Sequence, residues 1–256
     1  MRIFAANPGA LQRGLGFFAS KGRIISLVGG GGKSTLMYFL ATTCAKQGKR
    51  VLVTTTTNIF SPDPSIFAET EGEALALWKR GSIVVIGTPI PGQGKLKAPQ
   101  DALCRRLMDL ADITFIEADG SKHYPVKVPK EGEPVLLPES DTVLAVMGLS
   151  ALGKPLEQVA FRMPEVEKLL GVGGDHIFTE EDAARILASS FGGRKGVGDR
   201  NFCVVLNQCD DGPRRRSANL VAAYLERYDV HNVVMTAFDP GEREMFNKLA
   251  GVPIKS

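Results

Sequence analysis

The sequence has no apolar run long enough to cross a membrane, because its longest apolar stretches have only the length of a strand. Residues 1–8 lack the apolar core of a secretory signal. The 31 basic and 28 acidic side chains leave a net charge of +3, too small to indicate nucleic acid or a membrane surface as a partner. These absences predict a cytoplasmic protein that binds neither.

Cysteine and histidine are scarce and scattered. The four cysteines (Cys44, Cys104, Cys203 and Cys209) and the three histidines (His123, His176 and His231) show no metal-site spacing. Unclustered thiols fit a reducing compartment and argue against direct capture of a soft metal.

Strand-like and helix-like segments alternate along the chain. The strand-like segments, several of them continuous apolar runs, are 24–28, 51–54, 83–86, 113–117, 143–147, 202–206 and 232–236. The helix-like segments are 33–47, 71–79, 100–110, 180–189, 216–228 and 241–249. Apolar runs of this kind suit strands covered on both faces. We therefore expect an α/β fold with a doubly wound, mostly parallel sheet. Residues 1–256 are expected to form one domain with long functional loops near 87–99 and 120–138.

A glycine-rich loop follows the first apolar run. Gly29, Gly30, Gly31 and Gly32 precede Lys33, Ser34 and Thr35, which open a helix-like segment. Glycines let backbone N–H groups turn toward an anion, and the helix adds the positive end of its dipole. The order is that of a P-loop, in which Lys33 reaches the β- and γ-phosphates and Ser34 ligates Mg²⁺. Leu27 and Val28 depart from the related loop of the ParA/MinD class, which carries a glycine and a signature lysine there.

Polar residues end two further strand-like segments. Thr54–Thr57 follow the second one, and a threonine there, represented by Thr55, is a candidate for the Mg²⁺ shell or the γ-phosphate. Glu117, Ala118, Asp119 and Gly120 follow the fourth, as in the metal-insertion GTPases of hydrogenase and urease maturation. Glu117 and Asp119 both remain candidates for binding Mg²⁺ or orienting water.

Two more segments carry candidate contacts. Lys122 and Lys127 lie in a proline-containing basic loop suited to an acidic substrate or to charge on the γ-phosphate. Asn207 and Asp210 stand where GTPases place Asn-Lys-x-Asp, which favours guanine, although Gln208 replaces the lysine.

Together these segments resemble the YqeC family over roughly residues 10 to 250. The resemblance rests on the Lys-Ser-Thr loop, the Val-Leu-Val-Thr-Thr-Thr-Thr run, Glu-Ala-Asp-Gly-Ser-Lys, Gly-Leu-Ser-Ala-Leu-Gly-Lys-Pro and Asn-Gln-Cys-Asp. It implies a P-loop protein that serves the maturation of a selenium-dependent molybdenum hydroxylase. It also makes Lys154 and Arg162 candidates for substrate contact.

The leading hypothesis is a Mg²⁺-dependent nucleoside triphosphatase that uses GTP or ATP, with Lys33, Glu117 and Asp119 as its catalytic candidates. A molybdenum hydroxylase or its maturation factors, and a second copy in a homodimer, are the expected partners. The alternatives are a nucleotide-dependent binding switch with little turnover, and a small-molecule kinase or ligase.

Overall fold

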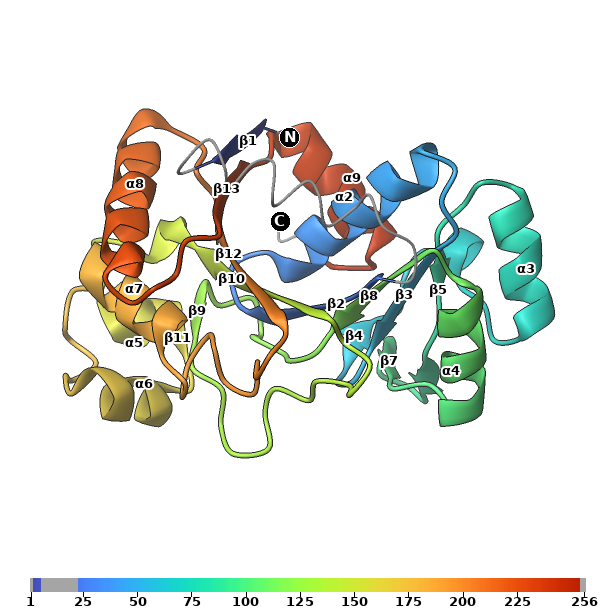
Figure 1. Ribbon diagram of the computed structural model, residues 1–256, viewed down its shortest axis with the longest axis horizontal. Helices are drawn as coiled ribbons and strands as arrows, with labels where there is room; N and C mark the ends of the chain where they lie inside the picture. The colour runs from blue at the N-terminus through green and yellow to red at the C-terminus, as the bar shows by residue number, and fades with distance from the viewer. Residues whose placement is uncertain (1, 6–22, 254–256) are drawn as a thin grey trace.

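A central sheet of eight strands organises the computed structural model, which describes residues 2–5 and 23–253 (Figure 1). The strand order is β1 (Arg2–Ala5), β13 (Val233–Ala237), β12 (Asn201–Asn207), β10 (Thr142–Gly148), β2 (Arg23–Gly29), β8 (Ile113–Glu117), β3 (Val51–Thr55) and β5 (Val84–Val85). Seven strands are parallel, and β1 pairs antiparallel with β13 at the edge. The predicted α/β, doubly wound sheet is therefore confirmed. The expectation for residues 1–8 lies mostly outside the described residues.

Helices cover both faces of this sheet (Figure 1). One face packs against α2 (Lys33–Lys46) and α9 (Pro240–Leu249), and the other against α7 (Glu180–Ala188) and α8 (Gly212–Glu226) on one side and α3 (Glu71–Lys79) and α4 (Asp101–Leu110) on the other. Successive residues of β10 alternate between the two cores: Val143 and Ala145 face one, Leu144 and Val146 the other. Because both faces of the sheet are buried, apolar and polar residues do not alternate along these strands.

The predicted elements agree closely with the observed ones. Each predicted strand ends within one residue of the observed strand, and so does each predicted helix except α8. Helix α8 begins at Gly212, four residues before the predicted start, because Asp211 accepts a hydrogen bond from Arg214 N and Pro213 suits the first turn.

The loops at one end of the sheet contain short elements that the sequence analysis did not predict. Segment 87–99 carries β6 (Thr88–Ile90) and β7 (Lys95–Lys97), which form a small antiparallel sheet with β4 (Ile59–Phe60). In segment 120–138, β9 (Val126–Lys127) pairs with β11 (Ala160–Phe161). Two short helices, α5 (Leu156–Val159) and α6 (Met163–Leu170), follow. These additions give the expected long loops a defined course over the strand ends.

The chain reverses direction across the sheet at β2. Strand β2 lies between β8 and β10, and the chain builds outward on both sides of this trio. In open α/β sheets the crevice at the carboxyl end of such a reversal is where ligands bind. The glycine loop leaves β2 at this point. We therefore expect a ligand to bind at the tips of β2, β8 and β3.

Candidate functional site

The glycine loop lies directly on the end of β10. Gly30 N donates to the Val146 carbonyl at 2.9 Å, and a Cβ on Gly31 would meet Gly148 N at 2.1 Å. Gly31 also has a positive φ of 77°. Gly31 must therefore lack a side chain for the loop and the strand to approach this closely, and a Cβ on Gly30 would meet the Tyr124 carbonyl at 2.5 Å. Gly148, which the sequence analysis treated only as part of a family motif, is as necessary to the loop as its own glycines.

Helix α2 begins immediately after this loop with an open N-terminus. Gly32 is its N-cap residue, with a positive φ of 99° and no side-chain cap. In the part of the chain that the structure describes, no protein acceptor contacts the N–H groups of Gly32, Lys33, Ser34 and Thr35. Four unpaired N–H groups at the positive end of a helix dipole suit an anion such as a phosphate.

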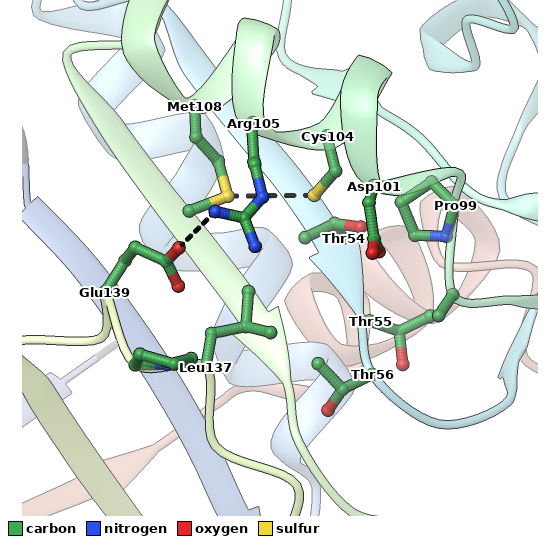
Figure 2. Close-up of a pocket in the computed structure, with 12 residues that line it drawn as sticks. Thr54, Thr55, Thr56, Pro99, Asp101, Cys104, Arg105, Met108, Leu137 and Glu139 are labelled. Carbon is green, nitrogen blue, oxygen red and sulfur yellow. Dashed lines mark hydrogen bonds and ion pairs between the residues drawn. The ribbon is translucent and has the colours of Figure 1, made fainter.

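The threonines at the end of β3 line a small pocket. Thr54, Thr55 and Thr56 face α4 across a space of about 90 Å³, with Cys104 and Met108 also lining it, as Figure 2 shows. Arg105 and Glu139 form an ion pair across it at 3.3 Å. A space of this size accommodates a ligand of a few heavy atoms.

Thr55 uses its hydroxyl within the backbone network. It donates to the Glu117 carbonyl at 2.9 Å and accepts from Thr57 N at 2.9 Å. This hydroxyl therefore joins the tips of β3 and β8.

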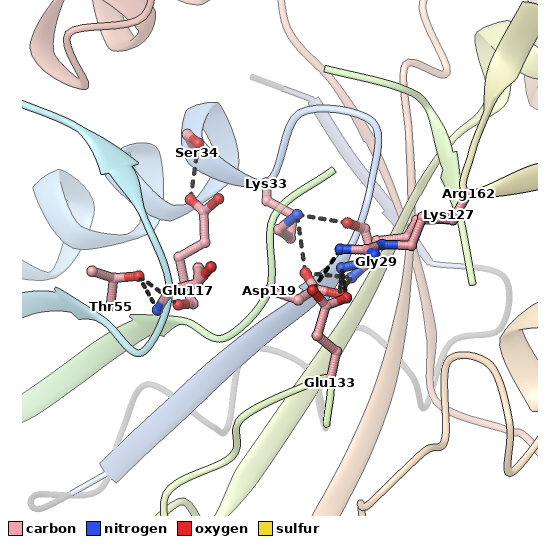
Figure 3. Close-up of polar contacts among 10 residues, drawn as sticks. Gly29, Lys33, Ser34, Thr55, Glu117, Asp119, Lys127, Glu133 and Arg162 are labelled. Carbon is pink, nitrogen blue, oxygen red and sulfur yellow. Dashed lines mark hydrogen bonds and ion pairs between the residues drawn. The ribbon is translucent and has the colours of Figure 1, made fainter. Parts of the chain in front are cut away.

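The two candidate carboxylates on β8 and the following turn face different partners (Figure 3). Ser34 Oγ donates to Glu117 Oε2 at 3.0 Å, whereas Asp119 Oδ1 lies 3.2 Å from Lys33 Nζ. Burial raises the pKa of Glu117, although Lys33 and the Ser34 hydroxyl act in the opposite direction. The sequence left both carboxylates open for the same task, and the structure gives each its own neighbour.

Asp119 accepts a hydrogen bond from one backbone N–H and forms ion pairs with two lysines. Gly29 N lies 3.1 Å from both carboxylate oxygens, Lys33 Nζ lies near Oδ1, and Lys127 Nζ lies 3.0 Å from Oδ2. Lys33 Nζ also donates to the Gly29 carbonyl at 2.6 Å. The Asp119 side chain is only 1% exposed, so these ionic contacts lie out of reach of solvent screening.

The ion pairs continue beyond Lys127. Its ammonium, 0% exposed, lies 2.8 Å from Glu133 Oε2, and Arg162 contacts Glu133 Oε1 at 2.7 Å (Figure 3). Lys127 and Arg162 were sequence candidates that this chain joins to the loop. Glu133 was missed, because a glutamate in a segment rich in proline and lysine gives no signal of burial.

The two remaining lysine candidates lie apart from these contacts. Lys122 is exposed, and its Nζ lies 5.6 Å from the centre of the Phe161 ring. Lys154 is exposed as well, and its backbone pairs with Ala151 and Phe178. Neither side chain has a recorded contact with Lys33, Ser34 or Asp119.

Asn207 contacts the loop itself. Its Nδ2 donates to the Gly31 carbonyl at 2.7 Å, and its Oδ1 accepts from the Thr236 hydroxyl at 2.8 Å. The sequence placed this asparagine beside a purine, but in this structure the side chain supports the glycine loop from below. Gln208, where GTPases have lysine, takes a positive φ of 66° and packs its side chain at Gly148.

Asp210 lines a cavity of about 430 Å³ beyond the tips of β12 and β13. Arg214 and Arg243 each lie 3.2 Å from its Oδ2, and Arg215, Phe238 and Pro240 also line the cavity. The volume falls in the range of small-molecule sites. The two arginines compete for the carboxylate that would read a guanine.

The described residues contain neither a further metal-binding cluster nor a membrane-spanning helix. No group of three or more His, Cys, Asp or Glu side chains is arranged to hold a metal ion among residues 2–5 and 23–253. In the same residues no helix is both long and apolar enough to cross a membrane.

Sequence comparison identifies the family. The model described as YqeC protein matches residues 25–164. The chain belongs to the YqeC family. The uncharacterized protein YqeC of Escherichia coli K12 is 33% identical over 207 residues, which span 75% of this chain and 77% of that protein. The resemblance drawn from the motifs is thereby confirmed, and this YqeC-family chain has the loop and fold of a nucleotide-binding P-loop protein.

A structural comparison gave a weaker match. The MinC:MinD cell division protein complex of Aquifex aeolicus matches with a TM-score of 0.44 and 12% identity, over 90% of this chain and 87% of that chain. At this TM-score the likeness carries no functional inference.

Proposed function

We propose that this chain binds and hydrolyses a nucleoside triphosphate with Mg²⁺, prefers GTP over ATP, and serves the maturation of a selenium-dependent molybdenum hydroxylase. The observation that carries the proposal is the pairing of four open N–H groups at the start of α2 with a buried Lys33. The pathway is carried over from what the YqeC family resemblance implies.

The phosphates would bind at the start of α2. The N–H groups of Gly32–Thr35 would hold the α- and β-phosphates, and Lys33 would reach the β- and γ-phosphates. Desolvation strengthens these charge-assisted hydrogen bonds, because Lys33 is only 3% exposed.

The residues beside Lys33 fit a Mg²⁺ ion. Ser34 Oγ and Glu117 Oε2 lie 3.0 Å apart, and Mg²⁺ takes oxygen ligands from one or two side chains together with phosphates and water. Bound there, the ion would neutralise charge on the phosphates. Glu117 would be the carboxylate at the metal, and Asp119 would act at the lysine.

The base would occupy the cavity beside Asp210. This cavity lies at the tip of β12, two strands away from β2 and the loop that carries Lys33. That separation suits a nucleotide that lies across the strand tips. The preference for GTP rests on Asp210, whose carboxylate guanine would share with Arg214 and Arg243.

Phosphate release from GTP, ATP and CTP, measured with and without Mg²⁺, tests the proposal. We expect slow Mg²⁺-dependent release from GTP that falls about a hundredfold in Glu117→Gln, a size typical of removing one group that acts at the reacting phosphate. Lack of binding and turnover for every triphosphate, with a hydroxylase partner present or absent, would refute the proposal.

A phosphotransferase is the second candidate, and the pocket beside Thr54–Thr56 favours it. This pocket adjoins the strand next to Glu117, where an acceptor would lie beyond the γ-phosphate. Transfer of labelled γ-phosphate to a molecule other than water would support this function over hydrolysis.

A further inference from the structure

Asp119 occupies the place of an anion in the glycine loop. Its two oxygens accept from Gly29 N and lie beside Lys33 Nζ, a glycine N–H and the loop lysine that a phosphate would also use. Gly29 ends β2 and Lys33 opens α2, whereas Asp119 lies in the turn after β8. A buried carboxylate in this position pairs with donors that a phosphate would also use.

The open N–H groups lie at the other end of the same loop. Gly32–Thr35 have no protein acceptor in the described part of the chain, whereas Gly29 N and Lys33 Nζ are occupied by Asp119. Because the helix start holds the α- and β-phosphates and the lysine reaches the β- and γ-phosphates, Asp119 competes at the terminal end. A diphosphate lacks the terminal phosphate, so it would compete with Asp119 less than a triphosphate would.

A second cation is available to receive the displaced carboxylate. Lys127 Nζ lies 3.0 Å from Asp119 Oδ2, whereas Lys33 Nζ lies 3.2 Å from Oδ1. In the chain of ion pairs that runs through Lys33, Asp119, Lys127, Glu133 and Arg162, the first three side chains are at most 3% exposed, so Lys127 would keep the displaced carboxylate paired away from water.

We propose that Asp119 competes with the terminal phosphate for Gly29 N and Lys33 and is the residue by which the site distinguishes a triphosphate from a diphosphate. It leaves Lys33 and Gly29 when the terminal phosphate binds, is held by Lys127 meanwhile, and returns when that phosphate is released. This rests on the proposed function and assigns Asp119 a part other than binding Mg²⁺ or orienting water.

Equilibrium binding of a non-hydrolysable GTP analogue and of GDP to the full chain tests this, in EDTA and in Mg²⁺. Asp119→Asn keeps the shape and an acceptor for Gly29 N but removes the competing charge. We expect it to bind the analogue about tenfold more tightly, the size of one charge-assisted hydrogen bond, and GDP less than about threefold more tightly. Lys127→Gln should weaken the analogue by about tenfold, because the displaced carboxylate then has no second cation.

The double variant and a charge control separate this from general electrostatics. In the Asp119→Asn background, Lys127→Gln should have little effect on the analogue, a non-additivity that marks the pair as coupled. Lys130→Gln removes the same charge from an exposed lysine three residues away and should change the affinity for the analogue less than twofold. Thermal melting of each variant checks that it folds. If Asp119→Asn does not fold, the affinity of Lys127→Gln for the analogue still tests the proposal.

The outcomes that overturn the inference differ from those that overturn the function. The role of Asp119 would be refuted if Asp119→Asn bound the analogue no more tightly than the wild type does, or if it gained equal affinity for GDP and the analogue. A loss of affinity in Asp119→Asn that occurs only when Mg²⁺ is present would refute it as well. In each case nucleotide binding itself would stand. Absence of nucleotide binding in the wild-type chain and in every folded variant would refute the proposed function, and this inference with it.

Discussion

The two ends of the candidate nucleotide site differ in how tightly their charges are enclosed. At the phosphate end, the side chains of Asp119 and Lys127 are 1% and 0% exposed, and their ion pairs join three segments of the chain. At the base end, Asp210 is 28% exposed and meets two arginines that reach solvent. Buried pairs are costly to disrupt and exposed pairs contribute little. Triphosphate recognition should therefore depend far more on the phosphate end.

The largest effect is expected from Lys33→Met, which removes the loop cation. We expect triphosphate affinity to fall at least about a hundredfold, because a desolvated charge-assisted contact is lost and Asp119 keeps only Gly29 N and Lys127. Lys46→Met, an exposed lysine on the same helix, is the matched control and should bind as the wild type does. Equal affinity in the two variants, measured by calorimetry, would place the phosphates away from this loop.

Asn207→Ala should come next, because it removes the support beneath the loop. The variant leaves the Gly31 carbonyl and the Thr236 hydroxyl without their partner, which costs about 1–3 kcal/mol of folding free energy. Nucleotide affinity should fall about tenfold as the loop loses its position, and this applies to GTP and ATP alike. A loss for GTP alone would show that Asn207 contacts the base, as the sequence first indicated.

The pH dependence of stability should expose the burial of Glu117. The pKa of Glu117 is raised in the folded chain, so folding favours its protonated form. The contribution of Glu117 to the free energy of unfolding is therefore complete below its unfolded pKa and is lost as pH rises through its folded pKa. Glu117→Gln stays neutral throughout, so its melting temperature should gain on the wild type as pH rises from 4 to 8 without nucleotide. If the melting temperature of Glu117→Gln does not rise relative to that of the wild type over this range, ionisation of Glu117 does not destabilise the folded chain.

The smallest effect is expected from Asp210→Asn at the base end. We expect stability to change by less than about 1 kcal/mol, because the ion pairs with Arg214 and Arg243 are partly exposed. The ratio of GTP to ATP affinity should fall severalfold, since guanine would lose a charged acceptor. Competition binding of the two nucleotides measures the ratio, and an unchanged ratio would remove the basis for guanine preference.

Much of the fold was predictable, because the features that set it are local in sequence. Apolar runs such as those at β8 and β10 mark strands buried on both faces, and four glycines before Lys33 mark the turn into α2. The strand tips bearing Glu117 and Asn207 followed from the parallel sheet. Each of these inferences needs only a short window of residues and a general rule of packing.

The pairing within the site was not predictable. Ser34 meets Glu117 and Lys33 meets Asp119 across more than 80 residues of chain, and nothing in either segment selects one carboxylate over the other. Lys127 lies in a segment whose sequence predicts exposure to solvent. Its burial depends on Glu133 and on the pairing of β9 with β11, which the sequence does not reveal. Which buried charges meet is set by tertiary packing, and a single sequence does not encode it in any short pattern.

A structure of the full chain with a non-hydrolysable GTP analogue and Mg²⁺ tests the central claim most directly. We predict the terminal phosphate on Lys33 and Gly29 N, Mg²⁺ between Ser34 and Glu117, and Asp119 turned to Lys127. A complex with Asp119 still on Lys33, or with the phosphates away from the start of α2, would contradict it.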